Sequence, residues 1–374
     1  LSMDAAMQTE IQQSLQLIDS LRASRISVVI MEDSTGDVLT SASYPLPTVD
    51  EPEKLTLTTA EENKLSYWIT NRDLGFTYAT QPGSTAKILT ASAAFNKVGM
   101  AAAGKTIQVR TQDLIRTKGE EPDEAGSITI ERAIVRSNNP FFIKLANEER
   151  LQEEMGTLYM QTGMFLRGVG GYYYEGDLFN TARQNKWREF WRTTEFTSVN
   201  SYDPNNIRAS RARGVSGMAW GQGELIATPA SMARMAAAIA NGGQMVPNRY
   251  VMKVSDSAFG TKQPVAILKD PQYAELLTRY MKAQSVGKFN RLNLYVAGKT
   301  GTPERMVRGE RINDGWYVFF APKASGRGHI VVCIRIEDTR GSSIAVRLAG
   351  SHIIPVLLKR RYIRSFEGSS RPQA

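Results

Sequence analysis

Residues 294–302 read Leu-Tyr-Val-Ala-Gly-Lys-Thr-Gly-Thr. The apolar start predicts a strand over 294–300, because a short apolar run bounded by glycine is typical of a buried strand. Its end carries Lys299, Thr300, Gly301 and Thr302, which place a cation, two hydroxyl groups and a bare backbone along one edge. Lysine supplies a point charge for a carboxylate, and glycine allows a peptide backbone to approach the strand. The stretch therefore predicts an edge strand that binds the carboxylate end of a peptide.

A second motif, Ser84-Thr85-Ala86-Lys87, opens a helical pattern after Gln81, Pro82 and Gly83. The Ser84 hydroxyl is expected at a helix N-terminus, where backbone amides favour developing negative charge. Lys87 lies one turn later on the same face, so its amine can meet the hydroxyl. A lysine base must be neutral, so its pKa must fall from about 10.4, and Lys299 would be the neighbouring cation. Taken alone, the motif is typical of a helix cap with a solvated lysine.

A third motif is Ser137-Asn138-Asn139, at the end of a helical pattern and before Pro140. A turn there would project Ser137 and Asn139 into a cleft between helices and sheet. Ser137 could relay a proton to a leaving amine, and Asn139 could hold a substrate amide as donor and acceptor. In isolation, the tripeptide is more often a turn or a cap.

Both short motifs occur a second time, as Ser-Val-Gly-Lys at 285–288 and Ser-Val-Asn at 198–200. The copy at 285–288 lies at the end of a predicted helix with a glycine inside it, so we interpret it as coincidence. Together, the three motifs indicate a serine nucleophile with lysine as its base. The backbone amides of Ser84 and Thr302 would form an oxyanion hole.

The composition excludes several other classes of protein. The chain has 374 residues, of which 42% are hydrophobic and 22% charged, as is typical of a globular protein. Its single cysteine, Cys333, excludes a disulfide framework. The two histidines, His329 and His352, have no acidic cluster beside them in sequence, so a histidine triad or a zinc site is not expected.

The formal net charge is +9, a balance that suits nucleic acid, anionic lipid or an acidic polymer. We interpret the strongest basic run, residues 359–361, as a solvated helix end. No phosphate-binding loop or aromatic–basic RNA motif accompanies it, so no nucleic-acid partner is predicted. No apolar run is long enough to span a membrane, and no signal peptide is visible. Because the chain starts at Leu1, we expect a trimmed segment whose membrane anchor precedes it.

Periodicity predicts an α/β chain of the α+β type, with one antiparallel sheet split by a helical insertion. Strands are predicted over 26–31, 38–41, 294–300, 316–320 and 329–336. Helices are predicted over 4–23, 85–97, 130–147, 229–241 and 271–284, and over 343–366 with a kink or start near Pro355. These elements predict a five-stranded sheet flanked by helices, with a sheet subdomain at about 1–60 and 286–374. The helical subdomain is predicted at about 61–285, and residues 368–374 are expected to be disordered.

The three motifs, in this order and at these spacings, resemble the penicillin-binding proteins and their serine β-lactamase relatives. Residues 220–224 (Trp-Gly-Gln-Gly-Glu) and the strand at 316–322 are similar to the high-molecular-weight, class B-like transpeptidases. The resemblance covers nearly the whole chain and implies the fold of that superfamily. Residues 160–215 depart from the family pattern, and they could form a lid, a partner site or surface packing.

The resemblance implies a D,D-transpeptidase that cross-links peptidoglycan stem peptides ending in D-alanyl-D-alanine. Ser84 would attack the peptide carbonyl, Lys87 would take its proton, and Ser137 would protonate the departing D-alanine. Thr300 and Thr302, on the strand with Gly301, would bind the terminal carboxylate with support from Lys299. β-Lactam antibiotics would acylate Ser84, and no cofactor or metal is implied.

The same resemblance implies a place in the cell envelope, at the outer face of the cytoplasmic membrane or in the periplasm, with cell-wall synthesis proteins as partners. Three alternatives stay open. One is a D,D-carboxypeptidase or endopeptidase, and another is a non-catalytic β-lactam sensor. The third is a β-lactamase, for which Glu175 would be the candidate base.

Overall fold

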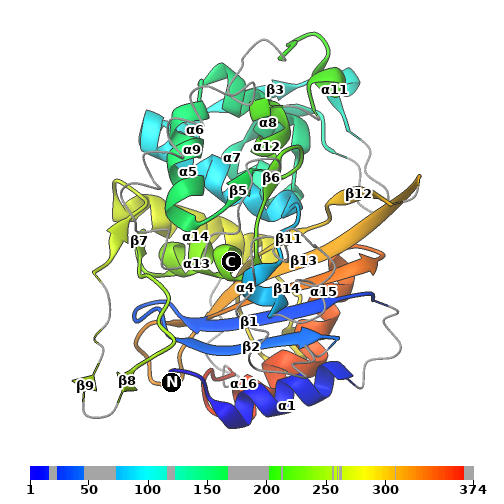
Figure 1. Cartoon of the computed structure of the whole chain (residues 1–374). Helices are drawn as coiled ribbons and strands as arrows, with labels where there is room; N and C mark the ends of the chain where they lie inside the picture. The colour runs from blue at the N-terminus through cyan, green and yellow to red at the C-terminus, as the bar shows by residue number, and fades with distance from the viewer. Residues whose placement is uncertain are drawn as a thin grey trace, which may run out of the picture.

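A computed structural model of the chain describes residues 1–16, 23–45, 73–115, 123–166, 202–211, 214–254, 257–258, 260, 263–307 and 309–365. Its central sheet joins strands from both ends of the sequence (Figure 1). The strand order is β11-β13-β14-β1-β2, and neighbours are antiparallel throughout. The bounds are β1 Ile26–Glu32, β2 Val38–Tyr44, β11 Ala297–Gly301, β13 Glu310–Pro322 and β14 His329–Thr339. The predicted five-stranded antiparallel sheet is therefore confirmed.

Alternate residues of the central strands enter two different hydrophobic cores, as the period of two in a strand requires. On β13, Val318 and Phe320 join the core shared with the inserted helices, whereas Tyr317 and Phe319 join the core on the opposite face. Because both faces are covered, the strands read as nearly continuous apolar runs. Lys299 of β11 pairs with Val318, which sets the register of the motif strand.

The face opposite the insertion is covered by helices from the two chain ends, α1 Ala5–Gln16, α15 Ser342–Leu348 and α16 Ile354–Lys359 (Figure 1). A π-helical segment, Ala349–Ile353, joins the last two. The prediction of one helix over 343–366 is thus wrong in extent, because the helix ends at Lys359 and Ile363 forms a β-bridge with Lys323. The start expected near Pro355 is confirmed, since α16 begins at Ile354 after the π-helical segment and proline is favoured in the first turn of a helix.

The other face is covered by α13 Pro229–Ala240 and α14 Pro271–Ser285, with the rest of the insertion beyond them. The predicted helix over 130–147 is two helices, α7 Ile130–Arg136 and α8 Asn139–Glu148, which separate at the serine motif. The remaining elements here are α4 Leu74–Thr77, η3 Gly83–Ala86, α5 Lys87–Val98, α6 Ala101–Gly104, β3 Thr106–Val109, η4 Thr111–Asp113, β4 Gly126–Thr129, α9 Gln152–Thr162, β5 Phe165–Leu166, α11 Ile207–Ser210, α12 Gly214–Ala219, β6 Leu225–Ile226, β7 Gln244–Met245, β8 Lys253–Val254, β9 Ser257–Ala258, β10 Val265–Ala266 and η8 Asn290–Leu292.

The sequence did not predict β12, Glu304–Val307, which pairs with the first residues of β13. Two of its four residues are charged, and three of the four in the partner segment Glu310–Asn313 are polar, so neither carries a long apolar pattern. The hairpin extends the sheet beyond the end of β11 (Figure 1).

Two glutamines of α1 cover the outer edge of β2. Gln8 donates to the Ser41 carbonyl and accepts from its N–H, and Gln12 does the same with Ser43, at 2.6–3.0 Å. The side-chain amides thus replace a neighbouring strand along an edge that would otherwise be open to pairing with another chain.

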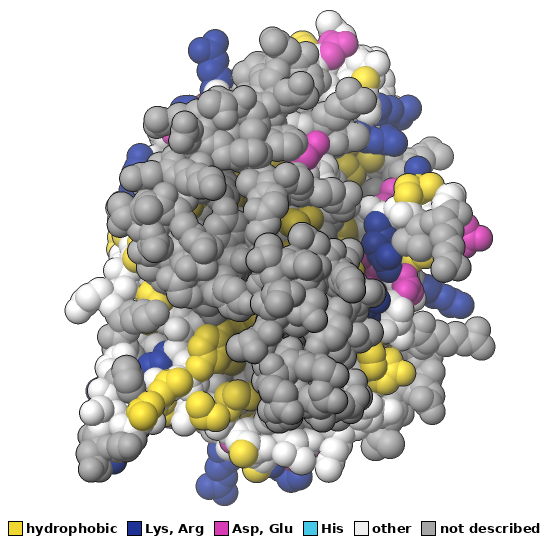
Figure 2. Space-filling model, viewed as in Figure 1, with side chains coloured by type: hydrophobic (Ala, Val, Ile, Leu, Met, Phe, Trp, Pro, Cys, Tyr) yellow, Lys and Arg dark blue, Asp and Glu magenta, His cyan; other side chains and the backbone are white. Residues whose placement is uncertain are grey.

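The basic run at 359–361 begins at the end of α16, as expected. Lys359 and Arg360 both pair with Glu10 of α1, at 2.9 Å. On the face drawn in Figure 2, described Lys and Arg side chains lie around the rim of the molecule, at the top, right and bottom of the view.

Candidate active site

Ser84 lies in the 3₁₀ turn η3, directly before α5, so it occupies the expected helix N-terminus. The turn contains Gly83, whose φ of +57° favours glycine. The Gly83 N–H donates to the Gly221 carbonyl at 2.9 Å, and a Cβ on Gly221 would lie 1.8 Å from the Gly83 oxygen. The absence of side chains at Gly83 and Gly221 therefore lets the turn that contains Ser84 pack against residues 220–224.

The motif strand packs against the same turn. A Cβ on Gly301 would lie 2.7 Å from the Pro82 carbonyl oxygen and 3.1 Å from the Thr85 nitrogen. Gly301 was expected to admit a substrate backbone, and the structure adds a second reason for glycine, the contact of β11 with η3. Ser84 is nearly buried, with 5% of its surface exposed.

Ser137 ends α7 in the left-handed region, with φ of +57°. Asn138 then caps α8, because its side-chain oxygen accepts from the Phe141 N–H and its amide donates to the Glu124 carbonyl. A non-glycine residue with positive φ is uncommon and is found mainly at functional or strained sites. The turn predicted from the sequence is thus present.

The side chains of three motifs meet at Ser137. Lys87 Nζ lies 3.1 Å from Ser137 Oγ and also donates to the Ser137 carbonyl and to Asn139 Oδ1. Lys299 Nζ donates to the same Ser137 Oγ at 2.9 Å. One hydroxyl therefore joins the amines of two lysines from different elements. Direct contact between Lys87 and the Ser84 hydroxyl stays a prediction.

Lys87 is buried, and its amine donates to three acceptors, the Ser137 carbonyl, Ser137 Oγ and Asn139 Oδ1. The side chains of Lys87 and Lys299 are both fully buried. Burial and a neighbouring cation each lower the pKa of an amine, because both disfavour its charged form. The three acceptors around Lys87 act in the opposite direction, so an uncharged Lys87 that accepts the Ser84 proton stays a prediction.

The two threonine hydroxyls each accept a hydrogen bond from the protein. Thr300 Oγ1 accepts from Gln284 Nε2 at 2.9 Å, and Thr302 Oγ1 accepts from the Ser342 N–H at 3.1 Å. A hydroxyl has a single proton and two acceptor positions. Each threonine therefore keeps its proton for another acceptor, as carboxylate binding requires.

Asn139 is 2% exposed. Its Oδ1 accepts from Lys87, and Asp123 accepts from its backbone N–H at 2.8 Å and lies 3.5 Å from Nδ2. The acceptor expected to hold a substrate amide thus faces the lysine, and the amide is oriented by Asp123. Sequence reasoning missed Asp123 because a carboxylate in an acidic stretch carries no local signal.

The repeated motifs lie elsewhere. Ser285 is the last residue of α14 and lies 3.1 Å from the hydroxyl of Tyr317, and Lys288 donates to the Gln284 carbonyl. The interpretation of residues 285–288 as a helix end is therefore confirmed. The copy at 198–200 and Glu175 lie outside the described residues, as does most of 160–215.

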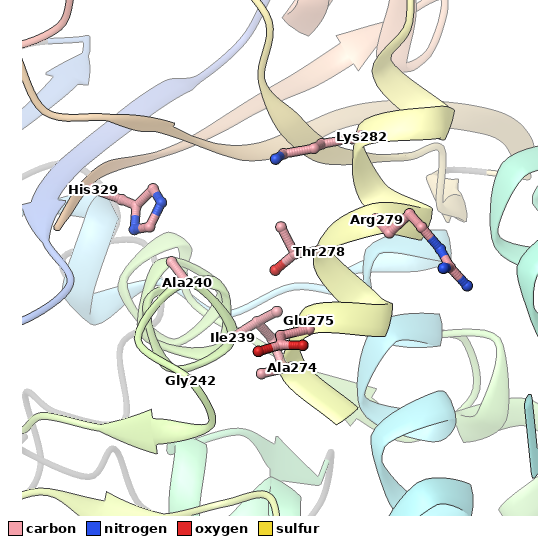
Figure 3. Close-up of a pocket in the computed structure, with 9 residues that line it drawn as sticks. All are labelled: Ile239, Ala240, Gly242, Ala274, Glu275, Thr278, Arg279, Lys282 and His329. Carbon is pink, nitrogen blue, oxygen red and sulfur yellow. The ribbon is translucent and has the colours of Figure 1, made fainter. Parts of the chain in front are cut away.

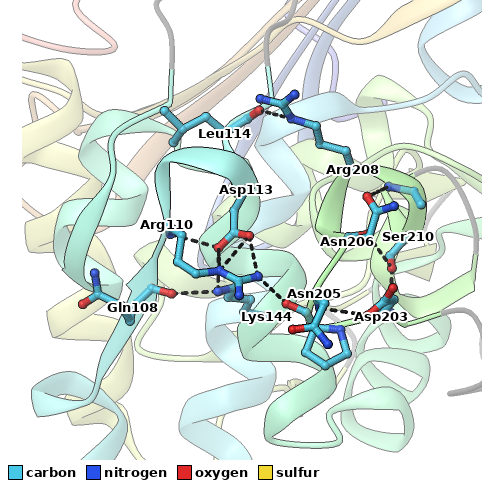
Figure 4. A network of polar contacts seen from close by, with 12 residues as sticks. Gln108, Arg110, Asp113, Leu114, Lys144, Asp203, Asn205, Asn206, Arg208 and Ser210 are labelled. Carbon is cyan, nitrogen blue, oxygen red and sulfur yellow. Dashed lines mark hydrogen bonds and ion pairs between the residues drawn. The ribbon is translucent and has the colours of Figure 1, made fainter.

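The insertion also contains a buried ion pair, in which Asp113 accepts from Arg110 and Lys144 (Figure 4). Burial opposes ionisation there, but these two hydrogen-bond donors lower the pKa of Asp113 to about 2. Lys144 is on α8, the helix that begins at Asn139, so the pair ties that helix to η4.

A separate pocket of about 390 Å³ lies between α13, α14 and the start of β14. In Figure 3, Thr278 and Lys282 extend from α14 on one side and His329 lies opposite. No residue of the three motifs lines it.

A family model, the penicillin-binding protein transpeptidase domain, matches residues 26–352 of this chain. The chain therefore belongs to that family, as the motifs predicted. It is similar to the transpeptidase domain of Burkholderia pseudomallei penicillin-binding protein 3, with 18% identity, a TM-score of 0.66 and 98% of each chain covered.

Two further solved structures share the fold. One is penicillin-binding protein A of M. tuberculosis as a penicillin G acyl-enzyme complex, with 19% identity and a TM-score of 0.64 over 96% of this chain and 80% of that one. The other is Pseudomonas aeruginosa PBP2 in complex with WCK 5153, with 19% identity and a TM-score of 0.66; the match covers 99% of this chain and 81% of that one. At these identities, the likeness establishes the fold alone.

Among the described residues, no helix combines the length and apolar character needed to cross a bilayer. Within the same part of the chain, no group of three or more His, Cys, Asp or Glu side chains is placed to hold a metal ion.

Proposed function

We propose that this protein is a D,D-transpeptidase that works through an acyl-enzyme on Ser84. The observation that carries the proposal is the convergence of Lys87 and Lys299 on Ser137 Oγ, with the Ser84 turn held against the end of β11. Family membership supports the same reaction class, since penicillin-binding transpeptidase domains are defined by it.

In the first half-reaction, Lys87 takes the Ser84 hydroxyl proton as the oxygen attacks the carbonyl of a terminal D-alanyl-D-alanine. The N–H groups of Ser84 and Thr302 stabilise the negative charge on the carbonyl oxygen. The C–N bond then breaks, and the proton reaches the leaving D-alanine through Ser137, which contacts Lys87. The product is an ester between Ser84 and the shortened stem peptide.

The terminal carboxylate of the donor binds to the hydroxyls of Thr300 and Thr302, and Lys299 adds electrostatic support. In the second half-reaction, an amine of another stem peptide attacks the ester and regenerates the Ser84 hydroxyl. The resulting amide bond is the cross-link. The proposed roles of Asn139 and Gly301 are to orient the Lys87 amine and to let β11 lie against the serine turn.

This substrate places the reaction at the outer face of the cytoplasmic membrane or in the periplasm, with other cell-wall synthesis proteins as partners. The chemistry needs no cofactor. β-Lactams would acylate Ser84, because they present a reactive amide and a carboxylate in the geometry of the donor peptide.

The test is intact mass spectrometry of the protein after treatment with penicillin G, followed by mapping of the modified peptide. We expect a single adduct on Ser84, no adduct in Ser84→Ala, and an adduct that still forms on Ser84 in Ser285→Ala. An adduct that persists in Ser84→Ala would overturn the site assignment.

The lifetime of the adduct and its fate then separate the alternatives. Loss within minutes indicates a β-lactamase, and a lifetime of hours indicates a transpeptidase or a sensor. Cross-linking of a donor peptide to an added amine identifies a transpeptidase. Release of D-alanine with water as the only acceptor identifies a carboxypeptidase. The absence of both reactions identifies a sensor.

A further inference from the structure

The last turn of α14 contacts the motif strand through Gln284, whose Nε2 donates to Thr300 Oγ1 at 2.9 Å. The approach depends on Gly298 at the start of the strand. A Cβ there would lie 2.9 Å from Ser285 Oγ and 2.8 Å from the Tyr317 hydroxyl, distances that real Cβ atoms essentially never show. The missing side chain therefore lets the end of α14 approach β11.

A second, longer contact agrees with this orientation of the Gln284 amide. Ser285 Oγ donates to Gln284 Oε1 at 3.5 Å and lies 3.1 Å from the hydroxyl of Tyr317. Burial raises the pKa of Tyr317, so the phenol keeps its proton at any working pH. Tyr317 can then donate to Ser285, which leaves the serine proton for Oε1. This arrangement agrees with the amide nitrogen facing Thr300, as the 2.9 Å bond indicates.

We propose that Gln284 is a positioning residue that directs the Thr300 hydroxyl proton toward the carboxylate of the donor peptide. One acceptor position of Thr300 Oγ1 is filled by Gln284 Nε2. The proton is then excluded from the position that faces Gln284, and it remains available to an acceptor on another side of Thr300. Without Gln284, the hydroxyl is free to rotate or to donate to water, so fewer molecules present the proton to the ligand. The inference rests on the proposed acylation of Ser84 and assigns a residue outside all three motifs.

The experiment compares two ligands that differ in the carboxylate alone, penicillin G and its methyl ester, with wild-type protein and Gln284→Met. Methionine keeps the side-chain length but cannot donate. We expect the acylation rate constant with penicillin G to fall about five- to tenfold, which is less than the loss of a whole hydrogen bond to a charged group because the Thr300 hydroxyl itself remains. With the ester, we expect a change below about twofold, because no carboxylate is there to accept the proton.

Two further variants make the result specific. Gln272→Met changes an exposed glutamine on the same helix and is expected to leave both rates unchanged. In a Thr300→Val background, Gln284→Met is expected to have no further effect on acylation by penicillin G, since the residue acts through that hydroxyl.

Each outcome has one meaning. Equal losses with penicillin G and the ester, or full additivity with Thr300→Val, would show that Gln284 supports the fold and not the hydroxyl, and no loss at all would also overturn the inference. Wild-type protein that penicillin G fails to acylate would instead overturn the proposed function.

Discussion

Lys299 Nζ lies 2.9 Å from Ser137 Oγ although 162 residues separate the two along the chain. Lys299 is on the edge strand β11, and Ser137 is in the turn between helices α7 and α8 of the insertion. The contact therefore spans the boundary between sheet and insertion. Because Lys87 reaches the same oxygen, any shift of the insertion relative to the sheet alters the surroundings of both amines.

Replacement of Lys87 by alanine should abolish most acylation without unfolding the protein. The base is lost, and we expect the rate constant with penicillin G to fall by about two to four orders of magnitude, the usual contribution of a general base. The measurement is the rate of adduct formation, with urea unfolding as a check of the fold. Lys97→Ala, on the same helix and paired at the surface with Glu154, should keep wild-type rates. An unchanged rate in Lys87→Ala would remove the lysine from its role.

The substitution Gly301→Ala should weaken both stability and acylation. The added methyl would lie 2.7 Å from the Pro82 oxygen, and such overpacking costs about 1–3 kcal/mol. The strand can relieve the contact only by moving away from the Ser84 turn. Urea unfolding and the acylation rate test the two effects. Gly104→Ala is the matched control, because a Cβ there meets no atom within 4 Å, and wild-type behaviour of Gly301→Ala would contradict the argument.

Loss of Gln12 should expose the outer edge of β2. Gln12→Ala leaves the Ser43 N–H and C=O without their partners, and we expect a loss of about 1–2 kcal/mol in the free energy of unfolding. The open edge should also promote self-association. Urea unfolding and sedimentation velocity measure these effects. Gln13→Ala, at an exposed position of the same helix, should change neither, and equal behaviour of the two variants would refute the role of Gln12.

The pH dependence of stability should contain a contribution from Asp314. Burial, followed by the charge of Glu337, raises the pKa of Asp314 from 3.8 to about 6. Between these values, the folded state binds more protons than the unfolded state, so this contribution to stability is present at low pH and is lost as pH rises through 6.

The control for this contribution is Asp314→Asn, which does not titrate. The free energy of unfolding of the wild type, measured relative to the variant in urea, should fall by on the order of 2 kcal/mol between pH 4 and pH 7. Parallel pH profiles for the two proteins would contradict the assignment.

Much of the fold could be predicted from the sequence, because the spacing of apolar residues and the positions of turn residues are local signals. Four strands of the sheet and α13, with proline at its start and Asn241 after its end, were predicted within about three residues, whereas β13 begins at Glu310, six residues before its predicted start. The misses have physical reasons. The strand β12 has only four residues, two of them charged, and the structure pairs it with β13. The C-terminal helix was overextended because the residues after Lys359 keep a helical composition.

The sequence by itself determined the chemical groups, the order of the motifs and the family, because these depend on residue types at fixed spacing. The tertiary structure alone decided that Lys87 and Lys299 share Ser137 Oγ, that Asp123 orients Asn139 and that Gln284 faces Thr300. Such contacts join different segments of the chain, and the close packing of the Ser84 turn, the motif strand and the end of α14 depends on the missing side chains of Gly83, Gly221, Gly298 and Gly301. No local sequence pattern encodes which segment packs against a given glycine, so only the tertiary structure shows this packing.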